Sequence, residues 1–223
     1  MDMKKRFWVL VLMMALLLSA CGGRQWTRSI SIRDGDSKGD QLEIPIRACV
    51  SGSPTHKGFH VKQNFEELVD KVTEAVSPLA VKEYQEKYIE IRTDTNVFLI
   101  QKADSYEREG GRYYNYHLLR PRADFLVEEL PFTMYIPLHL LYDVDHPYID
   151  AEVSVFPQTM ECEALGTVEE FYDFYDHIAR CEVTREGDAL RVSHRDGGTL
   201  VLTFAARDGK TFVTFEGVAT EPW

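Results

Sequence analysis

Alternating apolar and polar positions predict a β-hairpin near the start of the chain. Residues 29–33 and 41–48 both show a period of two, which is typical of strands with one buried face. The apolar positions of the two strands are Ile30, Ile32, Leu42, Ile44 and Ile46. The turn-rich residues 34–39 lie between them, and Pro45 is expected to place the second strand at a sheet edge. The glycines and proline of residues 51–62 then predict a loop.

A helical pattern begins at Asn64, which together with Glu67 has the spacing of a capping box. The apolar residues that follow recur every three or four positions, as on a helix with one buried face: Phe65, Leu68, Val69, Val72, Ala75 and Val76. Pro78 ends the pattern, because proline disfavours helical geometry in the residue before it. A second short helix is expected over residues 79–87. The strands expected after it cover residues 88–92, 96–102 and 112–118.

The same order of elements recurs in the last third of the chain. Thr167 and Glu170 have the spacing of a second capping box, and the apolar stripe behind them matches that of the first helix. Turn signals rich in Gly and Asp then separate four strands of a predicted meander. These strands cover residues 181–185, 189–194, 199–205 and 211–218.

These elements predict an α+β fold, in which antiparallel sheets carry two amphipathic helices packed on one side. The helices are displaced by 103 positions, from Phe65 to Val168, and a shift of 92 aligns the strands by placing Ile89 on Cys181. The chain is therefore expected to contain two helix-then-meander repeats, with an eleven-residue insertion after the first helix. The alternative is that amphipathic helices share this spacing by default, without any duplication.

The predicted organisation has an N-terminal half at residues 29–119, a connecting segment at 120–150 and a C-terminal half at 151–223. The connecting segment spaces several prolines among aromatic residues, which excludes a long helix. Its aromatic side chains either line a groove for an extended peptide or glycan, or fill the core between the two halves.

The first residues of the chain have the parts of an export signal. Three basic residues at positions 4–6 precede an apolar run at 7–18, which is too short to span a membrane. The stretch Leu18-Ser19-Ala20-Cys21 follows, and it resembles the lipobox of bacterial lipoprotein precursors. The alternative is an ordinary secretory signal with an incidental cysteine at its cleavage site.

The lipobox resemblance implies a signal peptide at residues 1–20 and a lipidated tether at residues 21–28. It also implies a diacylglyceryl group on the thiol of Cys21, whose two acyl chains form a stable membrane anchor. The expected location is therefore the cell membrane, with the lipid-anchored chain facing outside the cytoplasm.

Charge limits the partners that the chain is expected to have. Hydrophobic residues make up 44% and charged residues 27% of the chain, which is ordinary globular usage. Without residues 1–20, the chain carries 22 basic and 35 acidic residues, a net charge of −13. A surface this acidic is expected to repel nucleic acid and anionic lipid headgroups. Nucleic acid is therefore not an expected partner.

Three cysteines remain after Cys21. Cys162 and Cys181 flank the second predicted helix, so a disulfide between them is possible where they lie on neighbouring strands. The alternative is that Cys49, Cys162 and Cys181 are small buried hydrophobic residues without a bond. No C-x-x-C pair occurs, so neither a redox dithiol nor a zinc ribbon is indicated.

The densest polar cluster of the sequence contains Asp143, Asp145 and His146, with His139 and Asp150 close by. Such side chains offer oxygen and imidazole ligands to a divalent cation. The spacing lacks the glycine and glutamate of a calcium loop, so turn formation explains the acidic residues better. No metal and no cofactor are therefore expected.

A second candidate pair, His56 and His60, has the spacing of one helix face, but Gly58 and Pro54 favour a loop there and argue against a metal site. The common nucleophile, phosphate-loop and zinc-protease motifs are absent from the sequence.

The sequence therefore favours a non-catalytic binding or accessory module at the cell envelope. Its expected partner, besides the membrane, is an envelope protein, a peptide or a glycan. The alternative is an envelope hydrolase or metal-dependent enzyme that uses Asp143, Asp145 and His146. A third hypothesis is a lipoprotein whose acidic surface neutralises a basic partner.

Overall fold

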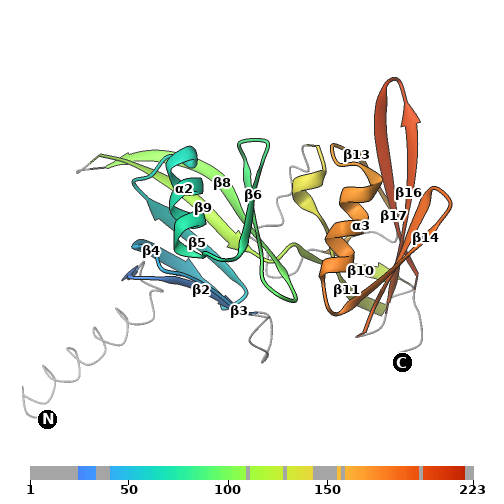
Figure 1. The fold of residues 1–223 in the computed structure, drawn as a ribbon, viewed down its shortest axis with the longest axis horizontal. Helices are drawn as coiled ribbons and strands as arrows, with labels where there is room; N and C mark the ends of the chain where they lie inside the picture. Colours follow the sequence, from blue (N-terminus) through green and yellow to red (C-terminus); the bar gives the residue numbers. More distant parts are fainter. Residues whose placement is uncertain are drawn as a thin grey trace, which may run out of the picture.

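The computed structural model describes residues 25–33, 41–108, 111–127, 130–142, 155–156, 159–195 and 198–218. Strands make up most of the described chain, accompanied by the helices α2 (Phe65–Ala75) and α3 (Val168–His177) and the short 3₁₀ helix η2 (Leu138–Leu140) (Figure 1). The strands up to residue 119 are β1 (Gln25–Thr27), β2 (Ile30–Arg33), β3 (Gln41–Ile44), β4 (Ala48–Gly52), β5 (His56–Val61), β6 (Ala80–Tyr84), β7 (Tyr88–Arg92), β8 (Val97–Arg108) and β9 (Gly111–Leu119). The strands after it are β10 (Arg122–Val127), β11 (Leu130–Tyr135), β12 (Val155–Phe156), β13 (Thr159–Ala164), β14 (Cys181–Glu186), β15 (Ala189–His194), β16 (Thr199–Arg207) and β17 (Lys210–Val218).

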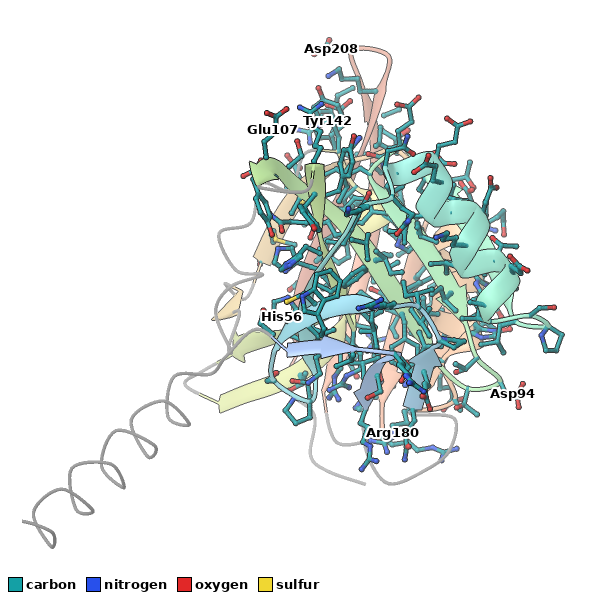
Figure 2. The ribbon with its side chains drawn as sticks, turned by 90° about the vertical axis from the view of Figure 1, so that its left-hand side faces the viewer. His56, Asp94, Glu107, Tyr142, Arg180 and Asp208 are labelled. Atoms are coloured by element: carbon teal, nitrogen blue, oxygen red, sulfur yellow. The ribbon has the colours of Figure 1, made fainter. Side chains whose placement is uncertain are left out.

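Two large sheets organise these strands. The seven-stranded sheet has the order β1-β4-β5-β9-β8-β7-β6, and the five-stranded sheet has the order β13-β17-β16-β15-β14. Two smaller sheets, β11-β10-β12 and the hairpin β2-β3, complete the described part. β16 and β17 form a long hairpin whose tip, at Asp208, projects beyond the rest of its sheet (Figures 1 and 2).

The two large sheets share one topology. In each, a strand leads into a helix, four strands follow as an antiparallel meander, and the first strand pairs with the last one. The first set is β5, α2 and β6 to β9, and the second set is β13, α3 and β14 to β17. We refer to the seven-stranded sheet with α2 as the N-terminal unit, and to the five-stranded sheet with α3 as the C-terminal unit.

The predicted α+β class is wrong, because strands dominate and the two helices contain only 11 and 10 residues. The helices also do not lie together on one side of a sheet, since α2 covers the outer face of the N-terminal unit and α3 lies between the two large sheets (Figure 1). The alignment at a shift of 92 is wrong as well. It places Ile89 of β7 on Cys181 of β14, whereas the topology makes β15 the equivalent of β7.

Two segments differ from their predicted structure. Residues 56–61, expected in a loop, form β5, and residues 80–84, expected in a helix, form β6. β6 is an edge strand with largely exposed side chains, so its sequence carries no alternating signal, and pairing with β7 decides its structure. The turn between β6 and β7 also lacks the usual sequence signal of a hairpin. Gln85 and Glu86 have positive φ angles of 58° and 51° there, where glycine or asparagine is usual.

The N-terminal unit buries both faces of its sheet. Ile89, Phe98 and Leu118 face α2, which contributes Phe65 and Leu68 to the same core. The apolar side chains of the β2–β3 hairpin close this core: Ile30, Ile32, Leu42 and Ile44. On the opposite face of the sheet lie Tyr88, Val97, Leu99 and Leu119, which belong to the core around α3. Strands buried on both faces read as continuous apolar runs, as the first four residues of β8 do.

α3 fills the space between the two large sheets. Its fully buried side chains Phe171, Phe174 and Tyr175 pack with inward residues of the C-terminal unit such as Leu202 and Phe215. The connecting segment adds buried residues to the same core: Met134, Tyr135, Ile136, Leu140 and Leu141. Of the aromatic side chains of this segment, Tyr135 therefore follows the core-filling alternative, whereas Tyr142 is 55% exposed and does not.

A polar cluster lies in the seam between the units. Nε2 of His139 is 2.8 Å from Oε2 of Glu90, and Arg92 bridges Glu90 and Asp173 of α3 with nitrogen–oxygen distances of 2.7 Å each. The contact between His139 and Glu90 is close but not aligned as a hydrogen bond, so it acts mainly through charge and polarity. Gln85 donates to the carbonyl oxygen of His139 at 2.7 Å. These contacts fix α3 and η2 against β7.

Candidate ligand-binding groove

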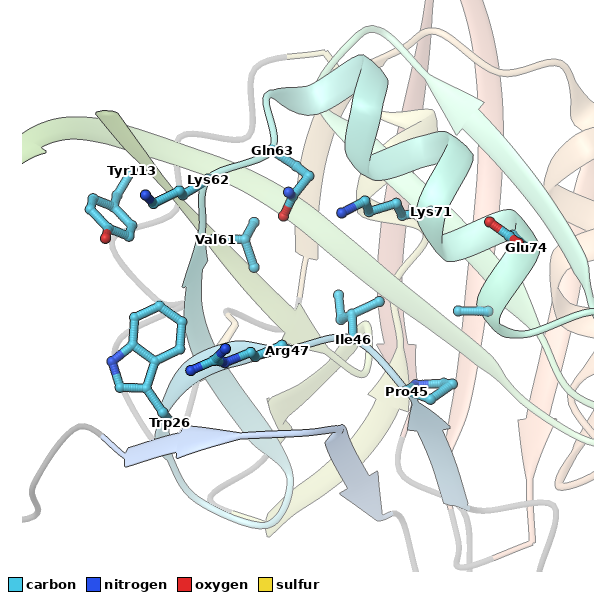
Figure 3. Close-up of a pocket in the computed structure, with 11 residues that line it drawn as sticks. Trp26, Pro45, Ile46, Arg47, Val61, Lys62, Gln63, Lys71, Glu74 and Tyr113 are labelled. Atoms are coloured by element: carbon cyan, nitrogen blue, oxygen red, sulfur yellow. The ribbon is translucent and has the colours of Figure 1, made fainter. Parts of the chain in front are cut away.

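A groove of about 830 Å³ opens on the N-terminal unit, where four separate parts of the chain meet. Trp26 and Tyr113 stand at one end of it, and Lys71 and Glu74 of α2 stand at the other (Figure 3). Its floor is apolar, formed by the buried Val61 with the half-buried residues Ile46 and Ala75. The groove has the size of a site for a small ligand or for a segment of a longer one.

Trp26 is placed by the pairing of β1 with β4. It lies opposite Cys49 across these strands, and Cys49 in turn lies opposite His60 of β5. The Trp26 ring meets the rings of His60 and Tyr113 edge to face, with centroids 5.9 Å and 6.5 Å away. Its side chain is nonetheless 50% exposed, and it is one of three large hydrophobic residues exposed in the described part of the chain.

An aromatic cluster holds this end of the groove in shape. Tyr106 and Tyr113 stack with centroids 5.8 Å apart and an interplanar angle of 18°. His60 meets both rings nearly at right angles, at 5.7 Å and 5.8 Å. Aromatic pairs in such arrangements stabilise the fold by more than their buried area alone provides. The neighbouring rings therefore hold the Trp26 ring in place while part of it stays exposed.

Positive charge surrounds the aromatic end of the groove. The guanidinium carbon of Arg47 lies 5.6 Å from the centre of the Trp26 ring, and Nζ of Lys62 lies 5.7 Å from that of Tyr113. Cations over aromatic faces are held by the charge distribution of the ring. With Lys71, the lining contains three basic residues against one acidic residue, Glu74. On a chain with a strong net negative charge, the groove is a locally basic surface.

Flat aromatic faces beside exposed cations suit a particular ligand chemistry. The aromatic faces pack on sugar rings or acyl groups, and the basic ends pair with carboxylates or phosphates. Arg47, Lys62 and Lys71 are all exposed, so a ligand reaches them without displacing protein.

The structure separates most of the candidate residues of the sequence from this groove. Cys21 and the cluster Asp143, Asp145 and His146 lie outside the described residues. His139 is buried in the seam between the units, away from the groove. Within the ranges that the structure describes, no group of three His, Cys, Asp or Glu side chains is arranged to hold a metal ion.

The possible disulfide between Cys162 and Cys181 is not formed, and both thiols are free. Cys162 lies on β13 and Cys181 on β14, which are the two opposite edges of the five-stranded sheet. Four strand spacings separate these edges, about 19 Å, whereas a disulfide needs Cα atoms within about 7 Å. The prediction failed because the helix between the two cysteines connects opposite edges rather than neighbouring strands.

His56 and His60 lie on β5, on the same face of the sheet, rather than in a loop. Nε2 of His56 is 3.0 Å from Nδ1 of His117, and the two rings stack with centroids 5.1 Å apart. Gly58 lies beside this pair, where a side chain would crowd Ser51 Oγ at 3.3 Å. The two predicted histidines therefore belong to different clusters, one with His117 and one with the groove aromatics.

Three carboxylates of α3 are engaged within the protein. Glu169 pairs with Arg185, Glu170 caps its own helix at Thr167, and Asp173 pairs with Arg92. Oε1 of Glu170 also lies 3.5 Å from Nζ of Lys82 in the N-terminal unit. This acidic face therefore links elements of the fold.

Sequence reasoning missed the groove residues Trp26, Arg47, Lys62 and Tyr113. Trp26 falls in the stretch expected to be a tether, of which residues 25–27 instead form β1. The signal available was a tryptophan followed closely by an alternating strand pattern.

Comparisons of the chain with protein-family models, with curated proteins and with solved structures find no match. Within the described ranges, neither helix is both long and apolar enough to cross a membrane.

Proposed function

We propose that the protein is a lipid-anchored extracytoplasmic lipoprotein that acts as a non-catalytic binding module, and that the groove is its ligand site. The observation that carries the proposal is the exposed aromatic and basic groove, in which Trp26 stands beside Arg47 and Lys62. This groove lies five residues from Cys21, the cysteine of the lipobox-like stretch.

The anchor would consist of a diacylglyceryl group on Cys21. Two acyl chains give a lasting attachment, since one chain alone binds membranes only marginally. The protein would thereby face outside the cytoplasm and concentrate its groove at the envelope.

The ligand class follows from the lining of the groove. Arg47, Lys62 and Lys71 favour anionic groups, and the Trp26 face favours a flat partner such as a sugar ring. An anionic glycan or peptide of the envelope has both features.

The anchor is tested by expressing the full-length chain in a bacterium that processes lipoproteins. Purification from membranes is expected to yield a chain that begins at Cys21 and carries the mass of a diacylglyceryl group. Cys21→Ala is expected to leave the membrane fraction, whereas the matched control Cys49→Ala is expected to remain lipidated. An unmodified Cys21 in membrane-derived protein would contradict the proposal.

The groove is tested through the fluorescence of Trp26. After removal of residues 1–20, the only other tryptophan is Trp223, so Trp223→Phe leaves Trp26 as the sole reporter. Titration with soluble peptidoglycan fragments and with polyglutamate is expected to give a saturable change in emission. Loss of Arg47 and Lys62 to alanine is expected to weaken binding about tenfold or more.

The matched control for charge is Arg195→Ala, an exposed basic residue of the C-terminal unit, which is expected to bind as the parent does. Equal affinity in all three proteins, or no response to any probe, would show that the groove does not bind soluble anionic glycans or peptides.

A further inference from the structure

We infer that the groove docks on the headgroup layer of the membrane that holds the anchor, so that its ligand is the phosphate of an anionic phospholipid at the surface. This inference rests on the proposed anchor at Cys21 and names the ligand of the same groove.

Only a short length of chain separates the proposed anchor from the groove. Trp26 follows Cys21 by five residues, which span at most about 18 Å when fully extended. The headgroup region of one leaflet is about 5 to 8 Å thick. A lipidated Cys21 therefore keeps Trp26 within about 18 Å of the anchor, so the aromatic end of the groove can reach the headgroups while the anchor stays inserted.

The aromatic end of the groove also has the chemistry of a membrane-surface site. Tryptophan prefers the boundary between membrane and water, where its apolar ring and its N–H group are both accommodated. Trp26 is exposed, and Arg47 lies over its ring with Lys62 over the neighbouring Tyr113. A tryptophan flanked by exposed cations matches the boundary between acyl chains and phosphates.

Charge is distributed unevenly along the chain. Residues 21–119 carry 14 basic and 15 acidic residues, whereas residues 120–223 carry 8 basic and 20 acidic residues. The net charge of −13 is thus almost entirely that of the second part, −12 against −1. The expectation that the whole surface repels anionic lipid therefore does not apply to the N-terminal unit.

The two units follow one another along the longest axis of the molecule (Figure 1). Charges separated by more than about 8 Å are largely screened at physiological ionic strength. Docking through the groove therefore brings the nearly neutral unit to the membrane, and repulsion from acidic groups farther than this from the headgroups is screened. The anchor also raises the effective concentration of headgroups at the groove, so a weak intrinsic affinity is sufficient.

The test uses the lipidated protein without residues 1–20, carrying Trp223→Phe so that Trp26 is its sole tryptophan, reconstituted into vesicles. One set of vesicles contains phosphatidylcholine alone, and the other also contains phosphatidylglycerol. Brominated phospholipid in both sets quenches tryptophan that lies at the headgroup boundary. Trp26 is expected to shift its emission to the blue and to be quenched in the anionic vesicles, with the effect decreasing as salt increases.

Charge reversal separates docking from mere proximity, because every variant keeps the same anchor. Arg47→Glu and Lys62→Glu are each expected to lower the docked-to-undocked ratio about fivefold or more. The control Arg195→Glu is expected to behave as the parent does. Quenching that is absent, or equal in all variants and both vesicle types, would overturn the inference.

Two further measurements distinguish the ways in which the inference can fail. Soluble glycerophosphoglycerol, the free headgroup, is expected to bind far more weakly than the vesicle surface, and equal binding would make a free phosphate ester the ligand instead. One outcome is that the protein floats with vesicles through Cys21 and binds soluble envelope fragments at the groove, yet shows no charge-dependent quenching of Trp26. That combination would refute docking and leave the proposed function intact. Lack of lipid on Cys21 would refute both.

Discussion

Nε2 of His139 lies 2.8 Å from Oε2 of Glu90, and this contact is buried between the two units. Removal of one partner from a buried polar cluster leaves the others without compensation. Glu90→Gln is therefore expected to lower the free energy of unfolding by about 2 kcal/mol or more, as measured by urea denaturation. The control Glu169→Gln removes an exposed carboxylate and is expected to change stability by less than about 0.5 kcal/mol. Equal effects of both variants would contradict this role of Glu90.

The same contact predicts how stability depends on pH. Burial lowers the pKa of His139 below its usual value of 6.5, so the unfolded chain binds more protons just below that pH. Burial raises the pKa of Glu90, but the contacts with His139 and Arg92 outweigh it and hold this pKa below 4.5. Stability is therefore expected to fall as pH decreases below 6.5 and again below 4.5.

Urea denaturation at a series of pH values checks this prediction. His139→Asn is expected to flatten the upper part of the curve, just below pH 6.5, because the variant has no imidazole to protonate on unfolding. A slope in that range that is unchanged by the substitution would assign it to other groups.

The turn between β6 and β7 predicts a stabilising substitution. Glu86 holds a φ of 51° in an exposed position, where a side chain costs energy that glycine avoids. Glu86→Gly is expected to raise the free energy of unfolding by about 1 kcal/mol. Asp94→Gly, in the turn between β7 and β8, changes a residue without a positive φ and is expected to be neutral or destabilising. A loss of stability in Glu86→Gly would contradict the strain at this turn.

The cysteines predict a labelling pattern. Burial raises the pKa of Cys181 to about 12 and also raises the pKa of Cys162, so few thiolates exist at neutral pH. Iodoacetamide is expected to leave these thiols largely unmodified in the native protein and to modify both in urea without a reductant, as read by mass spectrometry. A disulfide between Cys162 and Cys181 would appear as two thiols that react only after reduction.

α3 predicts that the two units unfold together. Phe174 is fully buried, and the core around it contains residues of both large sheets. Phe174→Ala is expected to cost about 3 to 5 kcal/mol and to reduce hydrogen-exchange protection in both sheets. The mirror substitution in α2, Leu68→Ala, is expected to affect the N-terminal unit more strongly. Loss of protection confined to the C-terminal unit in Phe174→Ala would contradict the shared core.

Local signals in the sequence predicted the elements that depend on neighbouring residues. Asn64 with Glu67 and Thr167 with Glu170 form both capping boxes, because a cap requires only residues three positions apart. The meander of β14 to β17 was predicted equally well, since glycine and aspartate mark each of its turns.

The sequence did not predict how distant segments of the chain pack together. β6 contains Ala80, Lys82 and Glu83, which are uncommon in strands, and its pairing with β7 makes the segment a strand. The groove combines Trp26, Arg47, Lys62, Lys71 and Tyr113 from different elements, and no single stretch of sequence contains its pattern. The layer position of α3 between two sheets likewise follows from tertiary packing, which the stripe on one helix face does not specify.

The early start of β1 has a mechanical consequence for a chain held at Cys21. Only four residues separate this cysteine from Trp26, and β1 is already joined to β4 along an edge of the large sheet. A few residues later, Ile30 and Ile32 of β2 are buried in the core that α2 shares. If the proposed lipid anchor holds the chain at Cys21, a force on the anchor is transmitted to the folded body through only four residues. The orientation of the body would then be coupled to that of β1.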